Sequence, residues 1–511
     1  MHHYDRSVDR REPGAMPRSG ARVLPLLAAL IAIAACGGSS GSDGPNAPLT
    51  ARLPLGLERD VSSFRSDPAA PAYYLDAARG NDTNDGRSPA SPWKTLDRLH
   101  AVVLKPGDVV RLARGSVWKN QCILLDNGSA GTGEKPVIFE AYGSGELPTI
   151  DAPRALWDKG REWPGVSLGR DSTAPKASSW IRVLDVRVRN LKGAGIAMSG
   201  ETSDILVAGC EVSACAMGVS IAGERQRVIG CYVHDGVMGV DTGDPDRDWG
   251  ANGVGVRGKD IEIAWNRFDR CIAPSKSFGT DGGAVEFFGY ESDTGALWDY
   301  ESENIAIHHN AVVDGDCFIE ALGKVRGMKI AWNLYESERP GALIFHLNSI
   351  RDDARYEVTI ANNTFVCAGG EKDGWGIVGL LVDWNKKTAP GLAASRFVVR
   401  DNVFVTDYAL MSWINPVGTN LVHDHNVISL VDGGRLSVNA DVWNADGEIL
   451  ADPAFVGETE SDYRLAPGSP ALAAGVPVSG IHDADWADLD LAGNAVRSRA
   501  VPDAGAFGAR P

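Results

Sequence analysis

The sequence has little basic charge, no long apolar segment and no simple short repeat. Lys and Arg supply 50 residues against 67 Asp and Glu, so the formal net charge is −17. We do not expect such an acidic chain to bind nucleic acid, because nucleic acid is recognised by basic patches. The apolar run Val23–Ala35 is too short to span a bilayer as a helix. The absence of a Gly-X-Y period excludes collagen.

Cysteine is scarce, and its spacing argues against a zinc site. The eight Cys residues form no CxxC pair and no Cys/His cluster with zinc spacing. Seven of them lie after Cys36, so an exported form of the chain would keep at least one free thiol. Apolar residues nevertheless make up 44% of the sequence and charged residues 23%. That composition is sufficient for a large folded core and excludes global disorder.

The N-terminus predicts export and lipid anchoring. Arg18 and Arg22 precede the apolar run 23–35, which is the order of basic and apolar residues in a secretory signal. The run ends in IAAC, which resembles the lipobox of bacterial lipoproteins and implies lipidation of Cys36. We therefore expect the protein to be exported and anchored by lipid in the bacterial cell envelope, at the outer membrane.

One short phrase recurs along most of the chain. It is an apolar run followed by Cys or Asn, one variable residue and another apolar residue, as in VIGCYV and VTIANNTF. The pivots are Cys210, Cys231, Asn266, Asn310, Asn333, Asn363, Asn402 and Asn426. We predict that the Asn side chains stack as an internal ladder, each amide bonding to the next. The two Cys pivots are expected to be stacked core residues, although a disulfide between them stays open.

A second phrase follows the compact pivots, as in NGVGVRG, GAVEFFG, CFIEALG and GALIFHL. Both phrases alternate apolar with other residues and contain many β-branched or aromatic side chains, which is typical of short strands. Units of two or three short strands that stack on one another predict a parallel β-helix. Each coil of such a solenoid buries its inner face against its neighbours. The high glycine content, 59 residues, fits the many corners between these strands.

The flanking segments resemble those of a known superfamily. YYLD at 73–76 with the following GNDTNDGRSPASPWKTL, and PDAGAFG at 502–508, resemble the first and last segments of bacterial right-handed parallel β-helix proteins of the pectate-lyase-like superfamily. The resemblance implies an all-β right-handed parallel β-helix over residues 73–508. An amphipathic helix at 94–104 is expected to cap its open end. The activity stays open, because the superfamily includes lyases, hydrolases, epimerases and non-catalytic surface proteins.

Strand alternation predicts a line of reactive side chains on the outside of the coil. If their neighbours face the core, Glu286, Glu320, His346 and Asp383 all face outward on consecutive coils. Repulsion between two carboxylates about 5 Å apart separates their pKa values, so one of them can stay protonated near neutral pH. Such a pair can cleave a glycosidic bond by acid/base or nucleophilic chemistry. Glu286 and Glu320 are the candidates for these roles, with His346 and Asp383 as orienting or binding groups.

Residues in the inserted loops are candidates for binding a substrate. Indole rings pack on the apolar faces of sugars, and several of the 14 Trp residues lie in or beside the insertions. The substrate-binding candidates are Trp249, Trp298, Trp384, Trp413 and Lys276.

An acidic loop keeps a second reaction open. Asp244, Asp246 and Asp248 could hold calcium through oxygen ligands. A calcium-dependent polysaccharide lyase would use a cation to neutralise a uronate carboxylate while a base removes the C5 proton. The hydrolase reaction requires no cofactor. A third alternative is a non-catalytic carbohydrate-binding or adhesin-like surface protein.

The sequence thus predicts a carbohydrate-active enzyme built as one solenoid. We expect a signal peptide over 1–35, a flexible tether over 36–72 and one β-helix domain over 73–508. Its partners are a polysaccharide and, through the lipid anchor, a membrane, and we expect a monomer. Neither the paired-Asp signature of pectin hydrolases nor the DPH-type motif of alginate epimerases occurs. The acidic chain favours a neutral glycan, or an acidic one bridged by metal.

Overall fold

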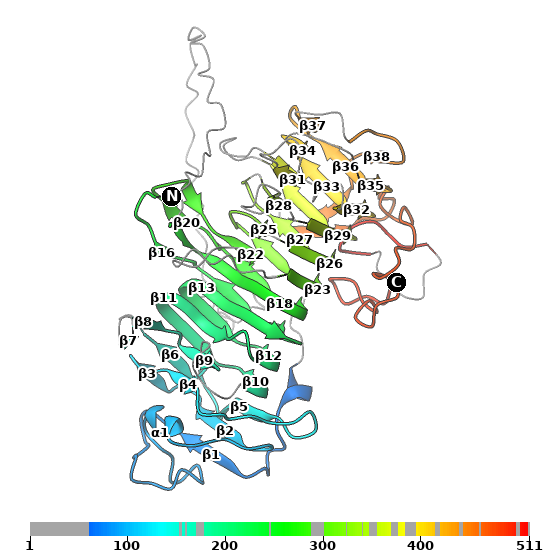
Figure 1. Ribbon diagram of the computed structural model, residues 1–511. Helices are drawn as coiled ribbons and strands as arrows, with labels where there is room; N and C mark the ends of the chain where they lie inside the picture. Colours follow the sequence, from blue (N-terminus) through cyan, green and yellow to red (C-terminus); the bar gives the residue numbers. More distant parts are fainter. Residues whose placement is uncertain are drawn as a thin grey trace, which may run out of the picture.

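The computed structural model describes residues 61–152, 156–158, 161–169, 178–244, 247–287, 301–322, 324–339, 341–346, 355–368, 377–383, 395–413, 420–438, 443–458, 461–496 and 501–508. Most strands pair in parallel with the equivalent strands of the previous and following coils (Figure 1). The fold is the predicted right-handed parallel β-helix. Three parallel sheets run along the coil. The predicted signal peptide, including Cys36, and most of the tether lie outside the described residues.

The first sheet forms one side of the coil, and every neighbouring pair in it is parallel. Its strands are β1 (Ala72–Leu75), β2 (Val109–Ala113), β5 (Val137–Tyr142), β10 (Ser179–Leu184), β12 (Ser203–Ala208), β14 (Arg227–Ile229), the end of β18 (Asn252–Ala264), β23 (Glu301–His308), β26 (Lys324–Ala331), β29 (Arg355–Ala361), β32 (Arg396–Arg400) and β35 (Leu421–Asp424).

The second sheet follows directly after the Cys or Asn pivots. Its strands are β3 (Val117–Lys119), β6 (Thr149–Asp151), the starts of β11 (Arg187–Met198) and β13 (Glu211–Glu224), β15 (Tyr232–His234), β19 (Arg267–Asp269), β24 (Ala311–Val313), β27 (Leu334–Glu336), β30 (Thr364–Cys367), β33 (Val403–Thr406), β36 (Val427–Leu430) and β38 (Ile449–Leu450).

The third sheet contains the second sequence phrase. Its strands are β4 (Ile123–Leu125), β9 (Val166–Leu168), the ends of β11 and β13, the start of β18, β22 (Gly283–Phe287), β25 (Ile319–Leu322), β28 (Leu343–His346), β31 (Ile377–Asp383), β34 (Ala409–Trp413) and β37 (Arg435–Val438).

In the described part of the chain, four antiparallel hairpins extend from the coil or its C-terminal segment. They are β7 (Leu156–Asp158) with β8 (Arg161–Trp163), β16 (Met238–Val240) with β17 (Trp249–Gly250), β20 (Ala273–Ser275) with β21 (Gly279–Asp281), and β39 (Phe455–Gly457) with β40 (Asp462–Leu465).

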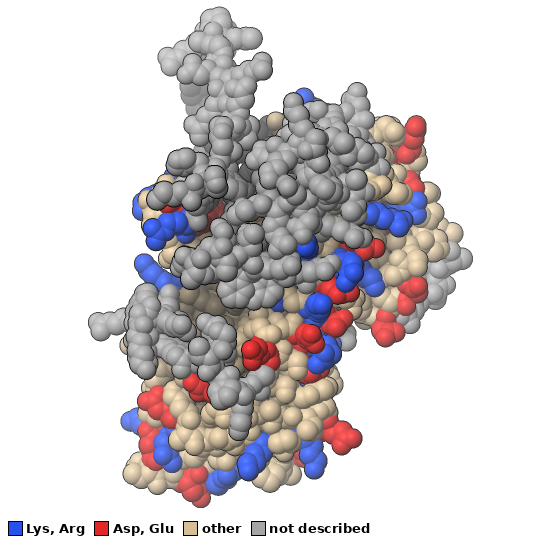
Figure 2. Space-filling view, viewed as in Figure 1, with Lys and Arg blue, Asp and Glu red and all other residues tan. Residues whose placement is uncertain are grey.

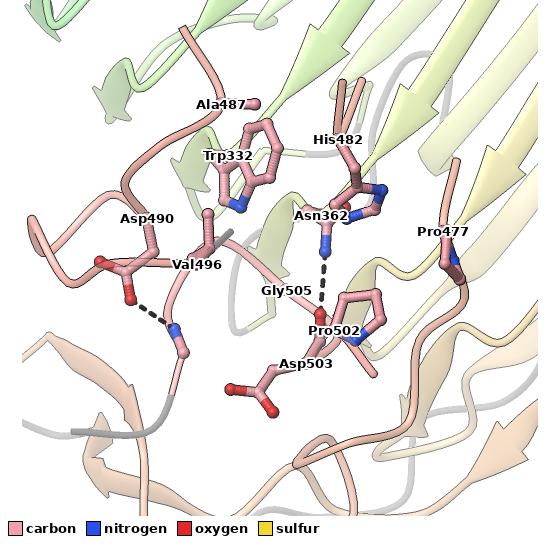
Figure 3. Close-up of a pocket in the computed structure, with 11 residues that line it drawn as sticks. Trp332, Asn362, Pro477, His482, Ala487, Asp490, Val496, Pro502, Asp503 and Gly505 are labelled. Atoms are coloured by element: carbon pink, nitrogen blue, oxygen red, sulfur yellow. Dashed lines mark hydrogen bonds between the residues drawn. The ribbon is translucent and has the colours of Figure 1, made fainter. Parts of the chain in front are cut away.

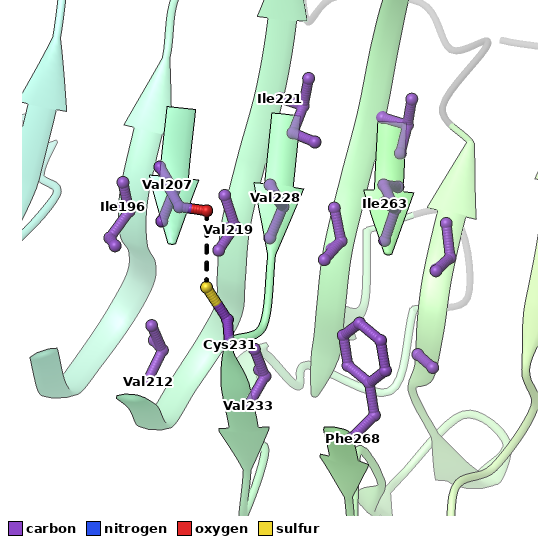
Figure 4. Close-up of a cluster of buried hydrophobic side chains, with 14 of the residues drawn as sticks. Ile196, Val207, Val212, Val219, Ile221, Val228, Cys231, Val233, Ile263 and Phe268 are labelled. Atoms are coloured by element: carbon purple, nitrogen blue, oxygen red, sulfur yellow. Dashed lines mark hydrogen bonds between the residues drawn. The ribbon is translucent and has the colours of Figure 1, made fainter. Parts of the chain in front are cut away.

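The core lies inside the coil and consists of stacked aliphatic side chains. Val207, Val228 and Ile263 are register partners on three consecutive strands of the first sheet, and each is fully buried (Figure 4). Because strand side chains alternate between the two faces, each coil contributes its inward residues to this continuous core. Both Cys pivots are buried and free, as expected, and the alternative of a disulfide between them is wrong.

The predicted asparagine ladder is confirmed. The amide Nδ2 of Asn310 donates to Oδ1 of Asn333 at 2.9 Å, and Nδ2 of Asn333 donates in turn to Oδ1 of Asn363 at 2.9 Å. The same connection links the other Asn pivots from Asn266 to Asn426. The ladder ends at Glu448, which accepts the backbone N–H of Asn426 at 2.8 Å. A carboxylate fits there because the last member only has to accept hydrogen bonds.

The N-terminal end of the coil is covered by turns, and the helix predicted over 94–104 is wrong in extent. Within residues 94–104, only α1 (Asp97–His100) is α-helical. Val102, Val103 and a nearby proline follow it, and these residues do not favour a continuing helix. Leu99 is nevertheless fully buried in the main core, so the segment still packs against it. A 3₁₀ turn, η2 (Ser62–Phe64), precedes this region.

The C-terminal segment, the described residues of 451–508, packs along the outside of the coil (Figure 1). Trp486 stacks on His308 with ring centroids 4.2 Å apart, and the Nε2 atom of His309 lies 2.7 Å from the Leu489 carbonyl oxygen. Tyr463 and Phe507 belong to an apolar cluster with residues of the second sheet. The segment therefore covers the corner between the first and second sheets.

The surface carries both signs of charge. Lys259 lies 3.5 Å and Arg326 lies 2.7 Å from the Glu303 carboxylate, which links neighbouring coils. On the face seen in Figure 2, acidic and basic side chains interleave over the described residues. No helix in the described part of the chain is long and apolar enough to cross a membrane.

Candidate active site

The third sheet carries the two predicted glutamates on its outer surface. Glu286 lies on β22 and Glu320 on β25, each between two residues that are at most 1% exposed. The glutamates themselves are half-buried and are direct register partners. Because neighbouring strands lie about 4.8 Å apart, the two side chains start from points at that separation. Their predicted outward pairing on consecutive coils is confirmed, and their catalytic role stays a prediction.

Glu286 is held in an environment that favours its protonated form. Burial, the Glu320 carboxylate and the Asp281 carboxylate raise its pKa well above the usual value for glutamate. The amide Nδ2 of Asn252, a side chain that is 3% exposed, donates a hydrogen bond to Oε2 of Glu286. This bond fixes one carboxyl oxygen, so the other is available to carry a proton. The arrangement places a carboxyl group that favours its protonated form next to a second carboxyl group.

Two further aspartates and a buried thiol complete an acidic cluster. Burial and the charges of Glu320, Asp316, Glu286 and Asp281 raise the pKa of the Cys317 thiol well above its usual value. The thiol is therefore protonated, and its Sγ lies 3.5 Å from the carbonyl oxygen of residue 282. A side chain at residue 283 would collide with Sγ at 2.5 Å, so a glycine is required beneath the cluster.

A polar bridge holds one side of this cluster. Oγ1 of Thr280 donates to Asp316 at 2.8 Å, and the Arg339 guanidinium donates to Oγ1 of Thr280 at 3.0 Å. Asp281 accepts the backbone N–H of Gly282 at 2.9 Å. The hairpin β20–β21 is thereby tied to the coil that carries Glu320.

His346 and Asp383 do not continue the line of the two glutamates. Ile344 follows Glu320 in the register, whereas His346 pairs with Leu322 and Asp383. The expectation of one column of four residues is therefore wrong. The core-facing residues of β28 align with those of β25. The residue of β28 that lies next to Glu320 is therefore two positions before His346. His346 and Asp383 form a second register pair, about 7 Å farther along the strands.

Trp249 and Lys276 lie in the two hairpins that precede Glu286 in the chain. Trp249 is half-buried, and its ring lies against Gly239 of the same hairpin. Lys276 is exposed, and its Nζ donates to the backbone oxygen of Asp241 at 2.6 Å and lies 3.5 Å from its carboxylate. Lys276 thus ties the hairpins together, and its proposed contact with substrate stays a prediction.

The other tryptophans are placed less directly. Trp298 and Trp384 lie outside the described residues. The register places Trp413 in the line of Ala321 and Phe345, which are both fully buried. The expected contact of Trp413 with substrate stays a prediction.

The calcium expectation for the acidic loop stays a prediction, and the described residues show how Asp248 is held. Asp248 accepts hydrogen bonds from the Thr242 hydroxyl at 2.8 Å and the Ser277 hydroxyl at 2.6 Å, and from two backbone N–H groups. Although burial opposes the shift, these bonds hold its pKa below the usual value. Its oxygens are thus already engaged, Asp244 is exposed and Asp246 lies outside the described residues. Among described residues, no three His, Cys, Asp or Glu side chains form a possible metal site.

Sequence reasoning missed Asn252, Asp281, Asp316 and Cys317. A usable signal was present for the aspartates, since each lies four or five residues before a glutamate of the pair and next to a glycine. Asn252 had no such signal, because it reaches Glu286 from the preceding coil, 34 residues earlier in the chain.

Comparison with known proteins gives limited matches. No protein-family model matches the chain. A local match of 94 residues, 34% identical, relates 18% of this chain to 6% of a lacto-N-biosidase of Bifidobacterium longum subsp. longum. The solved pectate lyase Pel9A is 15% identical over 86% of this chain and 96% of its own, with a TM-score of 0.49. A solved GH136 lacto-N-biosidase of Eubacterium ramulus is 17% identical over 75% of this chain and 67% of its own, with a TM-score of 0.38.

Proposed function

We propose that the protein is a glycoside hydrolase in which Glu286 is the general acid and Glu320 the nucleophile. The observation that carries the proposal is the register pairing of two half-buried glutamates, one of which has a strongly raised pKa. A carboxyl spacing of about 5 Å fits a retaining mechanism, whereas inverting enzymes need a wider gap for water. The local match to a protein named lacto-N-biosidase supports glycoside cleavage.

The reaction would proceed in two steps. Protonated Glu286 donates its proton to the glycosidic oxygen while Glu320 attacks the anomeric carbon, which releases the leaving alcohol and forms a glycosyl ester. Glu286, now a carboxylate, then takes a proton from a water molecule that attacks the same carbon and releases Glu320. Asn252 supports both steps by holding Oε2 of Glu286. No metal ion is needed for this chemistry.

A polysaccharide lyase is less well supported. A lyase must stabilise negative charge on a uronate, but Asp281 and Asp316 add negative charge beside Glu286 and Glu320. The same charges favour a neutral glycan as the substrate of the hydrolase. A non-catalytic glycan-binding protein would need no raised pKa at Glu286.

The deciding experiment incubates the soluble form, residues 51–511, with neutral and acidic polysaccharides and oligosaccharides. New reducing ends without unsaturated products indicate a hydrolase, whereas absorbance from unsaturated uronates indicates a lyase. Glu286→Gln and Glu320→Gln should each lower kcat by about 100-fold or more. Glu303→Gln is the matched control, because Glu303 pairs with Lys259 and Arg326 away from the pair. Retention of a glycan without turnover would refute the proposal and favour the adhesin alternative.

A further inference from the structure

A second polar site lies on a different side of the coil from the glutamate pair. A pocket of about 220 Å³ opens between the C-terminal segment and the corner that joins the first and second sheets. Trp332 and Asn362 line it from the coil, and His482, Asp490 and Val496 line it from the C-terminal segment (Figure 3). The glutamates belong to the third sheet, so this pocket is separate from the candidate active site.

The coil presents these two side chains because of its backbone conformation. Trp332 and Asn362 directly precede ladder asparagines and have left-handed φ values of 51° and 56°. At this corner the chain turns from the first sheet into the second while the next residue enters the core. The Asn362 amide donates to the Asp503 backbone oxygen at 2.8 Å, which fixes its orientation (Figure 3).

Two polar atoms in the pocket wall have no partner among the described residues. Oδ1 of Asn362, a residue only 2% exposed, accepts no hydrogen bond, and Nε2 of His482 is also buried without a partner. Nδ1 of His482 accepts the backbone N–H of Val478 at 2.8 Å, so the ring proton of neutral His482 lies on Nε2. The pocket thus offers one acceptor and one donor. A buried polar group without a partner is costly, which indicates that a ligand completes the site.

We propose that this pocket binds one neutral hydroxyl-bearing ring, such as a terminal hexopyranose residue of a glycan. A cavity of about 150 Å³ can hold benzene, so about 220 Å³ is sufficient for a six-membered ring. A sugar hydroxyl both donates and accepts, which matches Asn362 Oδ1 and His482 Nε2–H together. Trp332, Val496 and two prolines supply apolar walls for the C–H groups of a sugar.

The charges of the wall select against ionised ligands. Asp490 is buried and accepts the Asn494 side-chain amide at 2.9 Å and the Gly508 backbone N–H at 2.8 Å. Asp503 accepts the Ala473 backbone N–H at 2.8 Å. Two carboxyl groups in the wall disfavour a uronate, and the donor on His482 disfavours a cation. A neutral sugar carries no charge for these groups to repel.

The test is saturation-transfer NMR of the full chain with galactose, glucose, N-acetylglucosamine, galacturonate and glucosamine. We expect saturation of at least one neutral sugar, with a Kd in the millimolar range typical of a small polar ligand. Val496→Phe should fill the pocket and weaken binding at least 10-fold. Val501→Phe is the matched control, because Val501 is 47% exposed and does not line the pocket. Thermal melting checks that both variants fold.

A second variant protects the test against misfolding. Val496→Ala enlarges the pocket without blocking it, so it should retain binding where Val496→Phe loses it. The proposal is overturned if no neutral sugar is saturated, if galacturonate or glucosamine binds as well as the neutral sugars, or if Val496→Phe binds as the wild type does. Inactivity of the glutamate pair would not alter these outcomes, because none of the probes contains a glycosidic bond to cleave.

Discussion

Substitution of one ladder asparagine should destabilise the coil strongly. Oδ1 of Asn333 accepts both the backbone N–H and the amide of Asn310 at 2.9 Å, and its Nδ2 donates to the Ile307 and Ala331 carbonyls and to Asn363. Asn333→Ala removes all of these bonds from a fully buried position. It leaves the Asn310 backbone N–H without its acceptor and takes one donor from the Ile307 and Ala331 carbonyls. At about 1–3 kcal/mol for each buried group, the free energy of unfolding should fall by about 3–5 kcal/mol.

Asn333→Asp tests the direction of the ladder. The variant keeps an acceptor for Asn310 but places an oxygen opposite Ile307, Ala331 and Asn363, which all present oxygens. The folded protein therefore raises the pKa of the new carboxyl above its unfolded value. Its stability should lie close to that of Asn333→Ala at pH 8. At pH 5, where protonation restores one donor, the Asp variant should be the more stable of the two.

The assay compares urea midpoints at both pH values by circular dichroism, with hydrogen exchange of the peptide containing Asn310 as a local readout. The local readout matters because a solenoid can unfold in parts. Asn304→Gly is the control: Asn304 is exposed, makes one side-chain bond to Asp260 and has a left-handed φ of 55° that glycine tolerates. A loss below about 1 kcal/mol in Asn333→Ala would refute the reasoning. So would identical pH dependence of the Ala and Asp variants.

Three further predictions concern other groups. Asp281→Asn removes a charge that raises the pKa of Glu286, so the alkaline limb of kcat/KM should move to lower pH; an unmoved limb would contradict the assignment of Glu286 as the acid. Burial raises the pKa of Asp401 to about 7. The free energy of unfolding should therefore fall by up to about 4 kcal/mol as pH rises from about 4 to about 7. Asp401→Asn keeps an acceptor for the Val476 N–H and should abolish this loss, as measured by urea midpoints across that range. Cys36→Ser should abolish incorporation of labelled palmitate in cells and release the chain from membranes; unchanged labelling would contradict the lipobox interpretation.

The repeated phrases contain most of what is needed to predict the fold. Strand alternation in GAVEFFG and CFIEALG correctly puts Glu286 and Glu320 outside and their neighbours inside. The Asn pivots likewise predict the ladder, because a buried amide in every coil needs a partner and the next coil supplies it. These inferences hold because a solenoid repeats one local environment, so a local pattern is also a tertiary one.

Long-range register explains the errors. A shift of two residues in β28 separates His346 from Glu320, although alternation within each strand is unchanged. The helix expected at 94–104 shortens to Asp97–His100, because packing of a few apolar residues at the end of the coil does not require a continuous helix. In both cases the deciding contacts lie in another strand or at the end of the core.

The coil, the ladder and the pair of outward glutamates all follow from short periodic patterns that can be read along the chain. The folded chain was needed to show that Asn252 and Asp281 lie around Glu286, and that the C-terminal segment forms a pocket with Trp332 and Asn362. The physical reason is that burial and charge act through space. The pKa of Glu286 depends on groups from other strands, and no periodicity in the chain encodes which of them come together.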